Sequence, residues 1–185
     1  MRDCAAIAGI VFGLLAPAIV GAEEAGPAPA VVSELKVTTL STMMTELRGV
    51  GEWGFAALIE VDGQRVLFET GARPETVLKN AAELGIDLST VDTVVLSHNH
   101  WDPTGGLVTL RRALKDDHPA ALRVTHVGEG MFLPRVLSPE ALAAFPPIPR
   151  ELLVSAIEVR DRYEALGGRF VVHDEPHEVL PGVWI

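Results

Sequence analysis

The first half of the chain alternates between apolar and polar positions in patterns that predict β-strands. The segment "LKVTTL" (35–40) alternates with a period of two and is rich in β-branched residues, which favours a strand. In "FAALIEVDGQRVLFET" (55–70), two apolar runs flank Asp62-Gly63, a pair that suits a tight turn with positive φ. This segment therefore predicts a β-hairpin.

Helical periodicity follows the hairpin. The segment "PETVLKNAAELG" has Pro74 at a plausible first helical position and Gly85 as a stop signal. Its apolar face consists of Val77, Leu78, Ala81 and Leu84. A second helix is expected in "GGLVTLRRALKDD", where one stripe is formed by Leu107, Leu110 and Leu114.

The second half of the chain alternates strands with helices. A third helix is predicted in "VRDRYEALGG", because Ser155 and Glu158 form a capping box before it and Gly167 ends it. Further strands are expected in "VDTVVLS", "ALRVTHV" and "RFVVHDE", and "LPGVWI" is expected to begin another strand that stops at Ile185. Strands that alternate with helices after an initial hairpin predict a layered α/β domain.

The N-terminus has the parts of a secretory signal peptide. Arg2 precedes the apolar run "AAIAGIVFGLLAPAIV", and small residues follow it at Gly21-Ala22. We expect a signal peptide over 1–22, a linker rich in Ala, Pro and Glu over 23–34, and one domain over 35–185. The alternative is an uncleaved membrane anchor, although the apolar run is shorter than the roughly 20 residues of a typical span. Cleavage predicts a periplasmic or secreted protein with no stable membrane span.

Charge and cysteine content narrow the classes of function. The formal net charge is −10, which disfavours binding to nucleic acid. The single cysteine, Cys4, lies inside the expected signal peptide, so the mature chain would contain no thiol. A metal site in this chain must therefore use histidine and carboxylate ligands.

The segment "TVVLSHNHWDPTGGL" (93–107) contains the strongest candidate chemistry. In an extended segment His98 and His100 point the same way, so both imidazoles can reach one metal ion. The Asp102 side chain points the same way as these two histidines if the segment stays extended, and it can also turn toward them if the loop bends. Thr104 is expected to cap the following helix, and the two glycines permit close approach of backbone. The alternative is a group of solvated histidines on a loop.

These residues resemble a known motif. "LSHNHWDPTGGL" is similar to the His-x-His-x-Asp-His-x-Gly-Gly motif of the metallo-β-lactamase fold superfamily, and "VLFETGA" resembles the Asp-Thr-Gly segment that precedes it there. With "GIDLSTVDTVVLSH", the similarity is to the branch around dihydropterin-ribofuranosyl-aminobenzene phosphate synthase. The resemblance implies the N-terminal part of an αββα sandwich that is incomplete at its C-terminus. It also implies a small-molecule substrate and hydrolysis of a β-lactam, lactone, thioester or phosphoester with zinc, iron or manganese.

The resemblance implies roles for individual residues. His98 and His100 match ligands of the first metal site. Asp102 matches a ligand of the second site that can also orient the attacking water, which makes it the candidate catalytic residue. Pro103 replaces the next histidine ligand, so we expect at most one ion per chain. Glu69 replaces an aspartate that buttresses the site.

Other residues leave the function open. Among the remaining histidines, His126 could face the motif, whereas His118, His173 and His177 are expected to be exposed. Trp53 could form a pocket wall. Three hypotheses remain: an exported metal-dependent hydrolase, a truncated or degenerate homologue that binds metal weakly and catalyses nothing, and a binding module on the same scaffold. An incomplete sandwich would also expose a sheet face through which the chain could self-associate.

Overall fold

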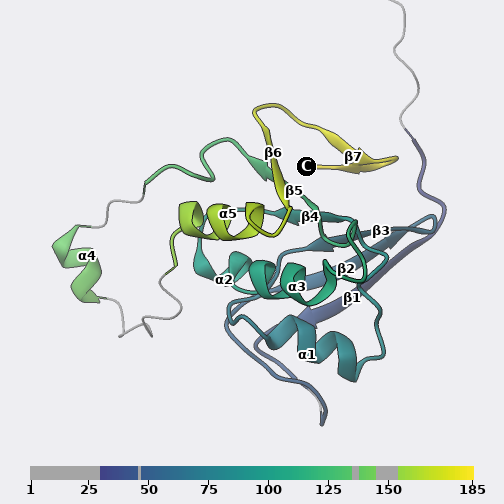
Figure 1. The fold of residues 1–185 in the computed structure, drawn as a ribbon, viewed down its shortest axis with the longest axis horizontal. Coiled ribbons are helices and arrows are strands. Elements are labelled where there is room, and N and C mark those ends of the chain that lie inside the picture. The colour runs from purple at the N-terminus through teal and green to yellow at the C-terminus, as the bar shows by residue number, and fades with distance from the viewer. Residues whose placement is uncertain (1–29, 46, 135–137, 145–153) are drawn as a thin grey trace, which may run out of the picture.

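The computed structural model describes residues 30–45, 47–134, 138–144 and 154–185 (Figure 1). The expected signal peptide and the linker as far as residue 29 lie outside the described residues. Among the described residues, no helix combines the length and the apolar character needed to cross a membrane.

One six-stranded sheet organises the domain, with strand order β1-β2-β3-β4-β5-β6. The strands are β1 (Leu35–Ser41), β2 (Ala56–Val61), β3 (Gln64–Phe68), β4 (Thr93–Leu96), β5 (Val124–Gly128) and β6 (Arg169–His173). The first three strands are antiparallel, whereas β3, β4, β5 and β6 run parallel. The helices are α1 (Thr76–Glu83), α2 (Trp101–Thr104), α3 (Leu107–Leu114), α4 (Pro139–Ala144) and α5 (Ala156–Glu164). The mixed sheet with its helices confirms the predicted α/β class.

The predicted hairpin forms between β2 and β3. Asp62 has φ 47° and Gly63 has φ 82°, the positive values that a tight two-residue turn requires. The Asp62 carboxylate also accepts hydrogen bonds from the backbone N–H groups of Ser33 and Glu34. The last residues of the expected linker are therefore attached to this turn.

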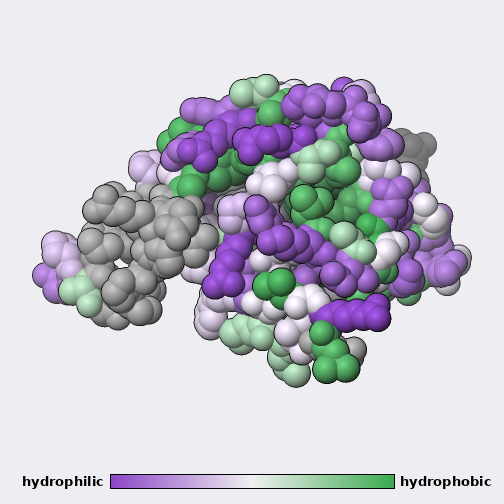
Figure 2. Space-filling model, turned by 60° about the horizontal axis from the view of Figure 1, so that its bottom comes forward, coloured by the Kyte–Doolittle hydropathy of each residue, from purple (hydrophilic) through white to green (hydrophobic). Residues whose placement is uncertain are grey.

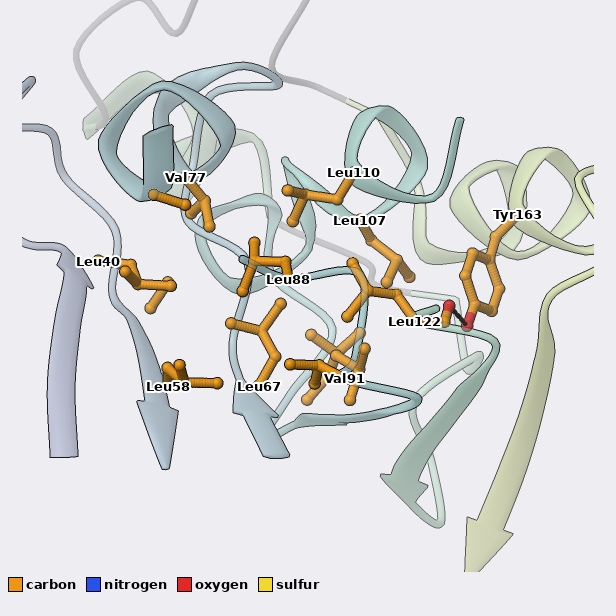
Figure 3. Packing of buried hydrophobic residues seen from close by; sticks show 14 of the residues in the cluster. Leu40, Leu58, Leu67, Val77, Leu88, Val91, Leu107, Leu110, Leu122 and Tyr163 are labelled. Atoms are coloured by element: carbon orange, nitrogen blue, oxygen red, sulfur yellow. Dashed lines mark hydrogen bonds between the residues drawn. The ribbon is translucent and has the colours of Figure 1, made fainter. Parts of the chain in front are cut away.

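The core lies between the sheet and the helices α1, α3 and α5 (Figure 3). Leu58 and Leu67 point from the strands toward Val77 of α1 and Leu107 of α3, and all four side chains are buried. Tyr163 of α5 is also buried, and its hydroxyl donates a hydrogen bond to the Leu122 carbonyl. Aliphatic side chains at helical spacing thus cover one face of the sheet, as their period predicted.

The other face of the sheet is partly open at its β1 edge. Leu35 and Val37 pair with β2 positions that alternate with the buried Leu58, so they lie on this second face. They are 62% and 55% exposed. A space-filling view shows that apolar side chains also gather in a patch bordered by hydrophilic residues (Figure 2). The described residues therefore leave apolar surface uncovered.

Some local expectations were wrong. Pro74 lies in the turn before α1 and not at the first position of the helix. Leu84 is the C-cap residue of α1, beyond its last buried residue, and its side chain is 55% exposed although it was expected on the apolar face. The strand expected in "LPGVWI" does form, as β8 (Val183–Trp184), but it lies outside the main sheet. Pro181 and Gly182 form a turn between β8 and β7 (Glu178–Leu180), and these two strands make a separate two-stranded sheet.

Candidate metal centre

The site lies where the parallel strands end. Because β3 to β6 run in the same direction, their carboxyl ends meet at one edge of the sheet, where open α/β sheets bind ligands. Glu69 follows β3 directly, and Ser97 and His98 follow β4 directly. The continuous apolar strand β4 is buried along its whole length and so provides a rigid support for the loop.

His98, His100 and Asp102 converge at this edge. The Asp102 Oδ1 atom lies 3.7 Å from His98 Nε2 and 3.8 Å from His100 Nδ1. One ligand atom from each of the three residues lies within 4.8 Å of the others. Asp102 Oδ1 is itself buried and has no hydrogen-bond partner. The structure thus brings together all three residues that the motif predicted.

Neighbouring polar groups hold two of these side chains in place. The Ser97 hydroxyl is 2.7 Å from His98 Nδ1, which leaves the Nε2 atom of this ring facing Asp102. The Trp53 indole N–H donates to Asp102 Oδ2 at 3.2 Å, so that Oδ1 is the oxygen that faces the histidines. Such partners of ligand side chains fix their orientation. Trp53 is 64% exposed and contacts the site through its hydrogen bond to Asp102, and its place in a pocket wall stays a prediction.

A short helix, not an extended segment, brings Asp102 to the histidines. Residues 101–104 form α2, so Asp102 is helical although it precedes a proline. Pro103 therefore neither holds Asp102 in an extended conformation nor turns its carboxylate away from the histidines. Pro103 is the third residue of α2, where a backbone N–H has no partner within the helix. Its carbonyl accepts hydrogen bonds from the Thr70 N–H at 2.8 Å and the Thr70 hydroxyl at 2.6 Å.

The two glycines after α2 allow the backbone contact that was expected. A Cβ atom on Gly105 would lie 2.0 Å from the Ala72 carbonyl oxygen, and one on Gly106 would lie 2.3 Å from that of Thr70. The expected capping role of Thr104 was wrong, however. Its hydroxyl donates to the His100 carbonyl within α2, and no side chain caps α3.

Glu69 holds the start of the histidine loop through a hydrogen bond to Ser97. Its Oε1 atom accepts a hydrogen bond from the Ser97 N–H at 2.9 Å, next to His98, as the buttressing role implied. The side chain is only 4% exposed, and its Oε2 atom has no hydrogen-bond partner. Burial raises the pKa of the Glu69 carboxyl to about 7, against the opposing effect of the Ser97 hydrogen bond. The residue also has φ 61°, a strained value for a side chain of this size.

Sequence reasoning missed the role of Glu52. This buried carboxylate accepts hydrogen bonds from the Ser41 hydroxyl and the Ala72 N–H on one oxygen, and from the Arg73 N–H and the Thr76 hydroxyl on the other. It therefore holds the segment that packs against Gly105. The only signal in the sequence was an isolated acid in the glycine-rich stretch "GVGEWGF".

The remaining histidines do not join this centre. His126 forms a second group with His173 and His177, and His118 is exposed as expected. The expectation of an exposed His173 was wrong, because its ring stacks on that of His126 and is partly buried. The pKa of His126 is lowered to about 4, mainly because the ring is buried and to a smaller extent because His173 and His177 lie beside it. His173 and His177 are separated by only three residues in "HDEPH", but His126 lies 47 residues before His173, so the sequence spacing signals two members of this group and not the third.

Comparison with known proteins establishes the family. Residues 54–180 match the metallo-beta-lactamase superfamily, so the chain belongs to this superfamily. It is 28% identical over 142 residues to 7,8-dihydropterin-6-methyl-4-(beta-D-ribofuranosyl)-aminobenzene-5'-phosphate synthase of Methanocaldococcus jannaschii, over 71% of this chain and 42% of that protein. This similarity agrees with the branch that the motifs indicated.

The chain is also similar to parts of solved structures. A metal-dependent hydrolase of the beta-lactamase superfamily is 30% identical with a TM-score of 0.36, over 51% of this chain and 30% of that one. An N-acyl homoserine lactone lactonase is 14% identical with a TM-score of 0.44, over 85% of this chain and 62% of that one. The chain thus spans less than half of this curated relative from Methanocaldococcus jannaschii and less than two thirds of these solved chains.

Proposed function

We propose that this chain is a metal-dependent hydrolase that holds one divalent cation through His98, His100 and Asp102. The observation that carries the proposal is the convergence of three potential ligand atoms on one point, with Asp102 Oδ1 buried and without a hydrogen-bond partner. A buried carboxylate oxygen that lies 3.7 Å and 3.8 Å from two imidazole nitrogens without a hydrogen bond to either is costly unless a cation balances it.

The donor atoms fit such an ion. Ligands bonded at about 2.0–2.1 Å in a tetrahedral site lie roughly 3.4 Å apart. The observed separations of 3.7 Å and 3.8 Å require only small adjustments to reach this value. Two imidazoles and one carboxylate suit zinc, iron or manganese and leave a position open for water or substrate. Pro103 offers no ligand, which supports a centre with a single ion.

The residues of the chain have distinct tasks in this proposal. When bound, the cation would polarise a carbonyl or phosphoryl oxygen and lower the pKa of water toward ~7. Because the Trp53 N–H occupies Oδ2, Asp102 would hold the cation through Oδ1 and use the second lone pair of this oxygen to orient the attacking water. The Ser97 hydroxyl keeps the His98 ring in position. The substrate class is an ester, lactone, lactam or phosphoester, whose cleavage adds one water across the scissile bond.

One observation favours a second candidate function. Pro103 stands in the place of a ligand and is accommodated in α2 without loss of a helical hydrogen bond. The fold is thus compatible with the loss of that ligand, as expected of a non-catalytic homologue that binds metal weakly.

Metal content and hydrolysis together separate the two candidates. Purified chain would be analysed for zinc, iron and manganese and assayed on a panel of ester, lactone, lactam and phosphoester substrates. His98→Ala should lose both metal at this centre and activity, whereas His118→Ala, a change at an exposed histidine elsewhere, should retain both. Metal that depends on His98 without any hydrolysis would support the non-catalytic homologue. Equal metal content in the wild type and His98→Ala would refute the centre.

We further propose that the protein is exported to the periplasm or secreted, on the basis of the apolar run and the small residues before Glu23. The intact mass of protein recovered from its host should correspond to a chain that begins at Glu23. A chain that still begins at Met1 and needs detergent for extraction would indicate a membrane anchor.

A further inference from the structure

We propose that His126, His173 and His177 form a second transition-metal site, separate from the centre at His98, His100 and Asp102. This site would join the β7–β8 hairpin to the main sheet. It does not depend on the proposed hydrolase function. It would raise the capacity of the chain to two ions, one more than the motif alone predicts.

The sheet places two of the three histidines beside each other. In the parallel pairing of β5 with β6, His126 lies opposite Val171, and His173 is two residues further along β6 on the same face. His126 Nδ1 lies 2.9 Å from His173 Nε2, and the two rings stack with 5.1 Å between their centroids and 4° between their planes. This position is set by strand register and not by a mobile loop.

The third histidine comes from outside the sheet. The His177 ring lies 4.2 Å from the His173 ring and 6.2 Å from the His126 ring. Two backbone hydrogen bonds, from the His177 N–H to the Ile185 carbonyl and from the Ile185 N–H to the His177 carbonyl, close the base of the hairpin. The position of His177 is therefore coupled to that of the whole hairpin.

A hydrogen bond between neutral His126 and His173 explains why these two rings lie together, but it does not explain why the His177 ring lies beside them. One ring nitrogen from each of the three histidines lies within 4.8 Å of the others. An ion bonded to three imidazoles at about 2.0–2.1 Å would replace the His126–His173 hydrogen bond with a slightly longer separation. Three imidazoles suit Zn²⁺, Ni²⁺, Co²⁺ or Cu²⁺ and disfavour Mg²⁺ or Ca²⁺, which prefer oxygen ligands.

The surroundings of the three rings suit a cation that remains accessible. His126 and His173 line a cavity of about 470 Å³, together with Asp174 and Glu175. These two acidic residues provide negative charge to balance a cation. Trp184 of β8 and Ile185 line the same cavity. An ion held by the three histidines would therefore fasten the hairpin over this cavity.

The test uses His177→Gln in the full chain, because His177 is exposed and its replacement leaves the core intact. His118→Gln is the matched control at another exposed histidine, and His98→Gln removes a ligand of the first centre. After treatment with a chelator, each protein would be titrated with Zn²⁺ by calorimetry and with Co²⁺ by absorption spectroscopy. Hydrogen exchange of the amides in residues 177–185 would be measured with and without Zn²⁺.

We expect His177→Gln to weaken one of two binding events by more than roughly a hundred-fold, which exceeds the loss of about 10- to 100-fold that is typical when an outer partner of a ligand is removed. Zn²⁺ should slow exchange in the hairpin of the wild type, His118→Gln and His98→Gln, but not of His177→Gln. Hydrolysis should depend on His98 and not on His177, so failure of either proposal can be recognised separately. Unchanged stoichiometry and unchanged hairpin protection in His177→Gln would overturn the second site.

Discussion

Replacement of Glu69 with glutamine tests how a buried carboxyl group below the metal centre affects stability. The pKa of Glu69 is raised from 4.5 to about 7 because the side chain is buried, 4% exposed. The folded protein therefore holds a proton on Glu69 in a pH range in which the unfolded chain has released it. Stability from this group is fully present below pH 4.5 and is lost as the pH rises toward 7.

The size of the effect follows from the shift. Each pKa unit corresponds to about 1.4 kcal/mol, so the rise of the pKa from 4.5 to about 7 corresponds to about 3 to 4 kcal/mol. Glutamine retains an acceptor for the Ser97 N–H and carries no charge at any pH. At pH 8 in the presence of a chelator, Glu69→Gln should be more stable than the wild type by as much as about 3 to 4 kcal/mol. At pH 4.5 the two proteins should agree within about 1 kcal/mol.

Urea unfolding at half-unit steps from pH 4.5 to pH 8, followed by circular dichroism, provides the measurement. The difference in the free energy of unfolding between the two proteins should grow with pH and level off above pH 7. A constant difference over this range would refute the reasoning, because it would mean that Glu69 ionises in the folded protein as in the unfolded chain. Glu69→Asp shortens the side chain but keeps the charge, so it should not remove the pH dependence.

Three further predictions concern the loop, its backbone contact and the surface. Pro103→His should increase zinc affinity at the first centre in a calorimetric titration, and His98→Ala should abolish binding there; equal binding by His98→Ala and the wild type would contradict the assigned ligands. Gly105→Ala should lower the free energy of unfolding by at least about 2 kcal/mol, because its Cβ would meet the Ala72 carbonyl, whereas Gly128→Ala, with no atom within 4 Å of the new Cβ, should change it little. Val37→Lys on the open sheet face should reduce self-association in analytical ultracentrifugation, and a wild type that stays monomeric at every concentration would exclude this face as an interface.

Local sequence determined most elements and the composition of the first centre. The Asp62-Gly63 pair specified the hairpin because few other residues accept its positive φ values. The apolar run of β4 predicted a fully buried strand, and the Ser155 side chain caps α5 by accepting from the Glu158 N–H, as the capping box predicted. The motif also identified His98, His100 and Asp102 as one group. These features depend on residues close together in the chain, so their pattern can be recognised in the sequence.

Only the tertiary structure decided which distant residues meet. Asp102 reaches the histidines because α2 turns the chain, and this turn is held by hydrogen bonds from Thr70 to Pro103. Glu52 finds its four donors in segments that precede and follow it by many residues. The group of His126, His173 and His177 arises from strand register and the closing of a hairpin. Contacts of this kind depend on how sheet and helices pack together, and no local period in the sequence encodes them.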